Sequence, residues 1–99
     1  MDIGIDLVKI ARIEQILTDQ KLVHKFFNAS EITDNLESLA GILAAKEAYM
    51  KACGDKLEWL SIEIKKNDLG KPYIVGKINT RVSISHDGDY AVAVVLIIN

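Results

Sequence analysis

The chain has 99 residues, a net charge of −2 and 49% hydrophobic residues. This composition excludes a disordered chain, and the small net charge provides no field that would attract long nucleic acid. No linker rich in Pro, Gly or Ser interrupts the sequence, so we expect one domain over residues 1–99. The single cysteine, Cys53, cannot form an intramolecular disulfide, and we recognise neither a signal peptide nor a membrane-spanning run, so we expect a cytoplasmic protein.

The first third of the chain predicts one strand followed by helices. Apolar residues alternate with other residues over 3–8, which is typical of a strand. They then recur at helical spacing over 10–18, and a short helix is expected near 22–27.

A longer central helix is predicted from Asp34 to Cys53. Asp34 followed by Glu37 resembles a capping box, and Gly54 is a natural C-terminal stop. Apolar or small residues cover most sides of this helix, so we expect it to be covered on more than one side.

The second half of the chain reads as four strands. Strands are predicted at 62–65, 71–75, 82–85 and 90–98, and Asp87-Gly88 is a strong hairpin signal between the last two. The element order predicts an α+β fold in which a largely antiparallel sheet packs against the long central helix and a shorter N-terminal helix.

Two elements suggest that the chain forms a homo-oligomer. The central helix has an apolar stripe on one side and small residues with few charges on the opposite side, and the last strand is apolar on both faces. A subunit interface would cover both elements. The alternative is that loops of the same chain supply this cover.

Acidic and basic residues on different predicted elements form the combination that a magnesium-bound polyphosphate site requires. These residues are Asp6 on the first strand, Lys46 and Glu47 on the central helix, and His86 at a strand end. Each has an ordinary alternative: Asp6 as a solvated carboxylate, Glu47 in an ion pair with Lys51, and His86 as a turn residue. Lys46 lies within the apolar stripe, so its ammonium must either snorkel to solvent or meet an anion.

Further polar residues could bind phosphate or an acidic partner. Ser83 and Ser85 share one strand face, and Gly70-Lys71-Pro72 puts a cation after a turn; both patterns are also common without a ligand. Arg12, Lys21 and Lys25 form a sparse basic set that could dock an acidic protein or simply be solvated.

Taken together, these segments resemble the holo-acyl-carrier-protein synthase type of 4′-phosphopantetheinyl transferase. The most specific pair is Ala44-Ala45-Lys46-Glu47-Ala48 with Ser83-Ile84-Ser85-His86. All matching segments occur in family order, at residues 3–8, 12–14, 39–41, 44–52, 62–64, 67–68, 70–72, 82–86 and 90–93.

The resemblance implies transfer of the phosphopantetheine arm of coenzyme A to a serine of an acyl carrier protein, with release of adenosine 3′,5′-bisphosphate. It implies a homotrimer with active sites between subunits, and Mg²⁺ bound at Asp6 and Glu47. Glu47 is our candidate for the base that takes the serine proton, directly or through a water. Arg12 would dock the carrier protein, with Lys21 and Lys25 nearby. The coenzyme A site would be lined by Lys46, Lys51, Gly70, Lys71, Pro72, Ser83, Ser85 and His86.

The sequence also departs from the family pattern. Ile42 replaces an arginine that is found in many members, and residues 54–59 replace a longer glycine-containing loop. Lys21 and Lys25 stand where arginines are common, and Asn28 where another cation would be expected. An alternative function is therefore a catalytically impaired member that binds coenzyme A or a carrier protein. A small structural oligomer is a third reading, which would require the joint motif match to be chance.

Overall fold

The computed structural model describes residues 1–99 and confirms the α+β fold, with every strand pair antiparallel. The strands are β1 (Asp2–Lys9), β2 (Ile64–Lys66), β3 (Pro72–Ile74), β4 (Thr80–Asp87) and β5 (Tyr90–Ile97). The helices are α1 (Ile10–Leu17), α2 (Gln20–Phe26) and α3 (Leu36–Cys53), with short 3₁₀ turns η1 (Ala29–Glu31) and η2 (Trp59–Ser61).

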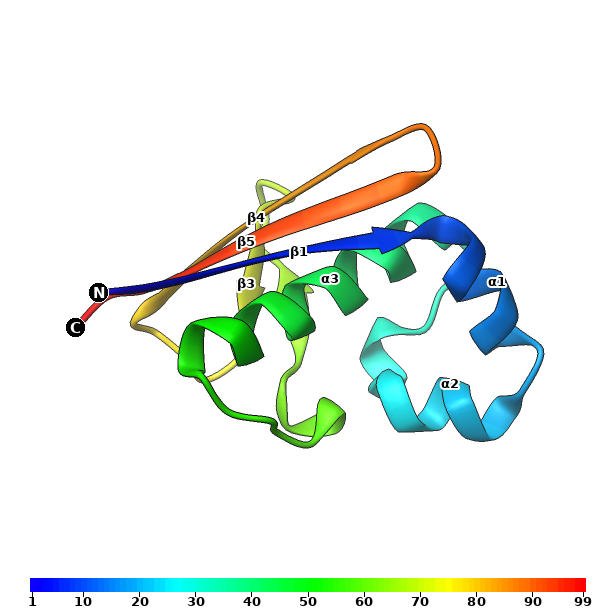
Figure 1. Ribbon diagram of the computed structural model, residues 1–99, viewed down its shortest axis with the longest axis horizontal. Helices are drawn as coiled ribbons and strands as arrows, with labels where there is room; N and C mark the ends of the chain where they lie inside the picture. Colours follow the sequence, from blue (N-terminus) through cyan, green and yellow to red (C-terminus); the bar gives the residue numbers. More distant parts are fainter.

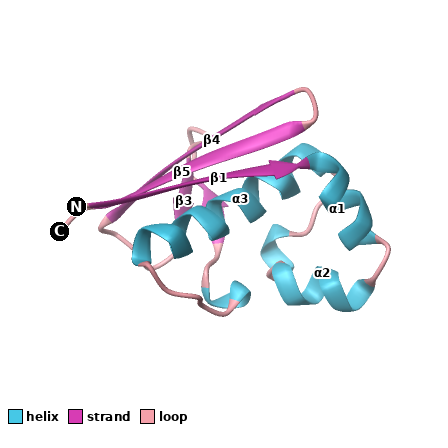
Figure 2. Ribbon diagram, viewed as in Figure 1, coloured by secondary structure: helices cyan, strands magenta, loops and turns pink.

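The long helix α3 lies between two layers of the same chain. On one side is the sheet β1-β5-β4, drawn above α3 in Figure 1, and on the other are α2 and the η2 turn. The two-stranded sheet β2-β3 lies beside α3 and next to β4 (Figure 2). The N-terminal strand β1 pairs with the C-terminal strand β5, so the two ends of the chain meet.

The predicted capping box at the start of the central helix is wrong. Asn35 is the N-cap, and its Oδ1 accepts a hydrogen bond from the backbone N–H of Ser38 at 3.0 Å. Glu37 therefore has no capping role, and its carboxylate pairs with His86. Gly54 ends α3 as predicted, with a φ of 71° that glycine adopts without strain.

The central helix obtains its cover from its own chain. Its buried residues occur on all sides: Leu39, Ala40, Gly41, Leu43, Ala44, Ala45, Lys46, Ala48, Tyr49 and Ala52. The helix therefore gives no reason to expect a partner subunit, and that part of the oligomer argument is wrong.

The outer face of the main sheet, in contrast, is apolar and uncovered. Ile3, Ile5 and Leu7 of β1 are 66%, 59% and 61% exposed, and they pair with the half-buried Leu96, Val94 and Val92 of β5. An apolar face of this kind is typical of an interaction surface. No helix of the chain is both long enough and apolar enough to cross a membrane.

β1 and α3 approach each other closely at Gly4. A Cβ placed on Gly4 would lie 1.9 Å from the backbone oxygen of Ala48 and 2.8 Å from the nitrogen of Ala52. No side chain fits there, so glycine is required for this spacing. The alternation of the strand then places Asp6, two residues later, on the same α3-facing side.

Candidate active site

Two acidic side chains meet between β1 and α3. Asp6 is buried, and its Oδ2 has no hydrogen-bond partner. Glu47, half-buried on α3, lies close enough to Asp6 for the two carboxylates to interact directly. The structure thus brings together the two residues that the sequence suggested as metal ligands.

Two cations flank the acidic pair. Arg12 of α1 contacts Glu47 with its Nη1 2.8 Å from Oε1. Lys51, one turn after Glu47, lies with its Nζ 2.8 Å from Asp6 Oδ1 and 3.0 Å from the backbone oxygen of Ile5. The alternative of a Glu47–Lys51 ion pair is therefore wrong, because Glu47 pairs with Arg12 and Lys51 pairs with Asp6. Hydrogen bonding to Asp6 raises the pKa of Lys51, so its ammonium stays charged.

The pKa of Glu47 is raised well above that of an ordinary glutamate. Burial, followed by the neighbouring Asp6 carboxylate, raises the pKa of Glu47 to about 7, although Arg12 opposes the shift. A carboxyl group with a pKa near neutrality can accept a proton in one step and release it in another.

The acidic pair has the donor chemistry that Mg²⁺ prefers. Mg²⁺ is usually bound by one or two carboxylates, with its other positions filled by water and substrate phosphates. Asp6 Oδ2 is a buried oxygen without a partner, and a cation would also relieve the repulsion between Asp6 and Glu47. No group of three or more His, Cys, Asp or Glu side chains that could hold a metal is present. Water or substrate oxygens would therefore complete the coordination of an ion held by Asp6 and Glu47.

A cavity of about 610 Å³, here called cavity 1, opens near the start of α3. Its walls include Gly70, Pro72 and His86, three residues that the resemblance assigns to the coenzyme A site, together with Ile42. His86 Nδ1 lies 2.5 Å from Glu37 Oε2 on α3. The volume falls within the usual range for small-molecule sites.

A second cavity of about 920 Å³, cavity 2, opens near the end of α3. Glu47 and Lys51 form part of its wall, and Trp59 and residues 54–57 form much of the rest. Glu37, which holds His86, lies ten residues before Glu47 on α3, a separation of roughly 15 Å along the helix. One phosphate group therefore cannot contact His86 and Glu47 of the same chain.

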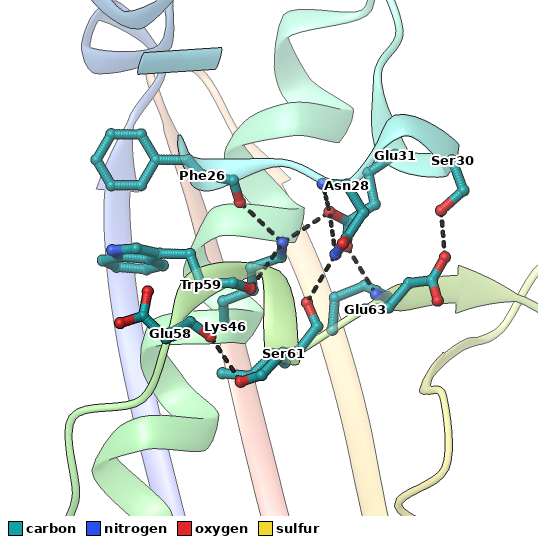
Figure 3. Close-up of polar contacts among 11 residues, drawn as sticks. Phe26, Asn28, Ser30, Glu31, Lys46, Glu58, Trp59, Ser61 and Glu63 are labelled. Atoms are coloured by element: carbon teal, nitrogen blue, oxygen red, sulfur yellow. Dashed lines mark hydrogen bonds and ion pairs between the residues drawn. The ribbon is translucent and has the colours of Figure 1, made fainter. Parts of the chain in front are cut away.

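Lys46 does not reach either cavity, although the resemblance assigns it to the coenzyme A site. Its side chain is 0% exposed, and its Nζ lies 2.7 Å from Glu31 Oε1, whose side chain is also 0% exposed (Figure 3). The anion that Lys46 required is therefore a carboxylate of its own chain. Burial lowers the pKa of Lys46, and the contact with Glu31 opposes that shift. Lys46 is therefore not available to a ligand in either cavity.

The other sequence-predicted residues are exposed. Ser83 and Ser85 lie on the outer face of β4, opposite Val94 and Val92 of β5, and so point away from cavity 1. Lys71 follows cavity-lining Gly70 but is not itself in the wall. Lys21 and Lys25 lie exposed on α2, with Lys25 Nζ 5.5 Å from the centre of the Phe26 ring.

Sequence reasoning missed Glu31. The signal was present, because Asn28 and Glu31 have the spacing of a capping box, and the Asn28 backbone N–H does donate to Glu31 Oε1 at 2.7 Å. The pattern did not show that the same carboxylate would be buried against Lys46.

The raised pKa of Glu47 predicts how stability depends on pH when divalent metal is absent. The folded chain keeps the Glu47 proton up to about pH 7, whereas the unfolded chain loses it near 4.5, so the free energy of unfolding falls as pH rises across this interval. In Glu47→Gln, which has no ionisable group at this position, this pH-dependent loss of unfolding free energy is absent. We expect the variant to be more stable than the wild type by about 1 to 2 kcal/mol at pH 8, with a smaller difference at pH 5.

Urea unfolding in EDTA at the two pH values measures this effect. Glu14→Gln, on the exposed surface of α1, is a control with the same change of charge and should keep the wild-type pH dependence. An equal pH dependence in Glu47→Gln and the wild type would show that Glu47 ionises normally.

Comparison with known proteins identifies the family of the chain. Residues 2–95 match the family model described as the 4′-phosphopantetheinyl transferase superfamily. Holo-[acyl-carrier-protein] synthases of Campylobacter fetus and Nautilia profundicola are 43% and 40% identical to the chain. The first match covers 98% of this chain and 99% of the relative, and the second covers 97% and 98%.

A solved structure of Helicobacter pylori holo-[acyl-carrier-protein] synthase in complex with coenzyme A has the same fold. It superposes with a TM-score of 0.88 at 36% identity, covering 96% of this chain and 98% of that one. The likeness extends over nearly the full length of each protein. The chain therefore belongs to the 4′-phosphopantetheinyl transferase superfamily.

Proposed function

We propose that the chain is a holo-acyl-carrier-protein synthase, which transfers the phosphopantetheine arm of coenzyme A to a serine of an apo acyl carrier protein. The observation that carries this proposal is the meeting of Asp6 and Glu47, with an unpartnered Asp6 oxygen, in a chain whose relatives have this activity. The cytoplasmic location expected from the sequence stays a prediction.

Asp6 and Glu47 are the residues that would hold Mg²⁺. The ion would neutralise the pyrophosphate of coenzyme A and polarise the phosphorus under attack. Glu47 is the proposed base for the serine hydroxyl, directly or through a water, and its pKa of about 7 suits that role. Lys51 remains charged beside the pair and would stabilise negative charge on the phosphate oxygens.

Cavity 1 is the proposed site for the nucleotide part of coenzyme A. Gly70 and Pro72 form one wall with little side-chain bulk, and His86 supplies a group that can donate to phosphate. Ile42 makes the wall near α3 apolar where many family members have an arginine. Lys71 is next to this wall and would reach the phosphates from outside.

The two halves of this site belong to different subunits of a proposed homotrimer. His86 of β4 contacts Glu37 of α3, which lies ten residues before Glu47 on that helix. One phosphate group therefore cannot contact both His86 and Glu47 of the same chain. Packing the outer sheet faces of three copies together would cover Ile3, Ile5 and Leu7. Ser83 and Ser85 lie on the same outer face, so the interface would bring them toward a neighbouring subunit.

The carrier protein is proposed to dock on α1 and α2. Arg12 contacts Glu47, so an acidic partner bound there would bring its serine close to the proposed base. Lys21 and Lys25 would extend the basic surface along α2.

Mass spectrometry of an apo acyl carrier protein, after incubation with the chain, coenzyme A and Mg²⁺, tests the function. We expect a gain of one phosphopantetheine that is lost in EDTA and in Glu47→Ala, with the oligomer of that variant intact. Binding of coenzyme A without transfer to any of several carriers would instead support the impaired member. The departures at Ile42 and residues 54–59, which border the two cavities, would then be the first to examine.

Mixing two inactive variants tests whether the site is shared between subunits. Glu47→Ala and His86→Ala should each be inactive alone. In random trimers from an equal mixture, about a quarter of the sites combine an intact Glu47 from one subunit with an intact His86 from another, so about a quarter of the wild-type activity should return. Asp6→Ala mixed with Glu47→Ala is the matched control and should regain nothing, because both residues belong to the same half. Equal recovery in the two mixtures, or none in either, would contradict the composite site.

A further inference from the structure

We propose that the buried ion pair between Lys46 and Glu31 is a positioning device that holds the walls of both cavities against α3. It rests on the proposed function only in so far as coenzyme A and the catalytic carboxylate use those cavities. Lys46 lines neither cavity, and Glu31, although it lines cavity 1, has a side chain that is 0% exposed and paired within the chain. Both residues therefore act through the segments that they hold.

Lys46 ties two separate segments and Glu31 to α3. Its Nζ donates to the backbone oxygen of Phe26 at 2.8 Å, to Glu31 Oε1 at 2.7 Å and to the backbone oxygen of Trp59 at 3.2 Å (Figure 3). These bonds use all three protons of the ammonium. The acceptors lie at the end of α2, in η1 and in η2, so one side chain fixes the whole layer opposite the sheet.

Glu31 extends the same network to β2. Its Oε1 also accepts from the backbone N–H of Asn28 at 2.7 Å and from Asn28 Nδ2 at 3.2 Å, and its Oε2 accepts from the backbone N–H of Ile64 at 2.8 Å. The side chain of Glu31 is buried and fully paired, so the start of β2 is held in a defined place.

The segments held in this way are the cavity walls. Glu31 and Ile64 line cavity 1, and Trp59 lines cavity 2. Lys46 directly precedes Glu47 on α3, so the turn that presents the proposed base is the turn to which both walls are attached. A wall that shifts by a fraction of an ångström would alter both coenzyme A binding and its alignment with Glu47.

Stability alone does not account for this pair. Removing two charges from water is costly, and a well-packed apolar pair of similar size is often equally stable or more so. An apolar pair, however, would lack the directional bonds to Phe26, Trp59 and Ile64. What the ion pair adds is the placement of those three backbone groups.

The test replaces both charges together, because either single change would leave an unpaired buried charge and risk unfolding. The variant is Lys46→Met with Glu31→Gln, in which the new amide oxygen can still accept from Ile64. The control is Val23→Ala, a buried change on α2 that lines neither cavity. All proteins are assayed well below their melting temperatures.

Two readouts separate positioning from general destabilisation. We expect the KM for coenzyme A to rise about tenfold in the double variant and less than about twofold in Val23→Ala. Trp59 is the only tryptophan, so its emission reports directly on the η2 wall. We expect the emission to shift to longer wavelength and to be quenched more readily by acrylamide in the double variant alone.

A double variant that matches Val23→Ala in either the KM for coenzyme A or the Trp59 emission would overturn the proposal. If the wild type shows no transfer, the proposed function fails separately. The dissociation constant of coenzyme A, measured by calorimetry on the same variants, then replaces KM and still decides whether the ion pair positions the cavity walls.

Discussion

The close contact between β1 and α3 is the constraint on which the site depends. Gly4 lets the strand lie against the backbone of Ala48, and the strand alternation then turns Asp6 toward the helix. Glu47 is one residue before Ala48, so the two carboxylates are brought together by backbone packing and not by a flexible loop. Burial, followed by the neighbouring Asp6 carboxylate, raises the pKa of Glu47, so keeping both groups ionised there costs stability.

The same arrangement is the basis of the proposed site shared between subunits. Glu47 lies in the second half of α3 beside Asp6 of β1, whereas the contact with His86 is made by Glu37 in the first turn of α3. The apolar outer face of the sheet, with Ile5 at its centre, provides a surface through which a second copy could complete the site. The proposed trimer accounts for both features with one interface.

Much of the fold could be predicted from the sequence, because apolar periodicity marks strands and helices directly. Sequence reasoning was less successful where the outcome depended on tertiary contacts. Lys46 was recognised as a cation within an apolar stripe, but its partner Glu31 is fifteen residues earlier and could not be paired with it from spacing. Similarly, Asn35 and not Asp34 caps α3, and spacing could not decide between them because Asp and Asn are both favoured N-cap residues.

The central claim is that Asp6 and Glu47 form one divalent metal site. Titration of the chain with Mn²⁺, followed by the electron paramagnetic resonance of the free ion, measures it without any substrate. We predict one site per chain in the wild type, weakened at least about tenfold in Asp6→Asn and unchanged in the exposed control Asp2→Asn. Equal Mn²⁺ affinity in the wild type and Asp6→Asn would contradict the account.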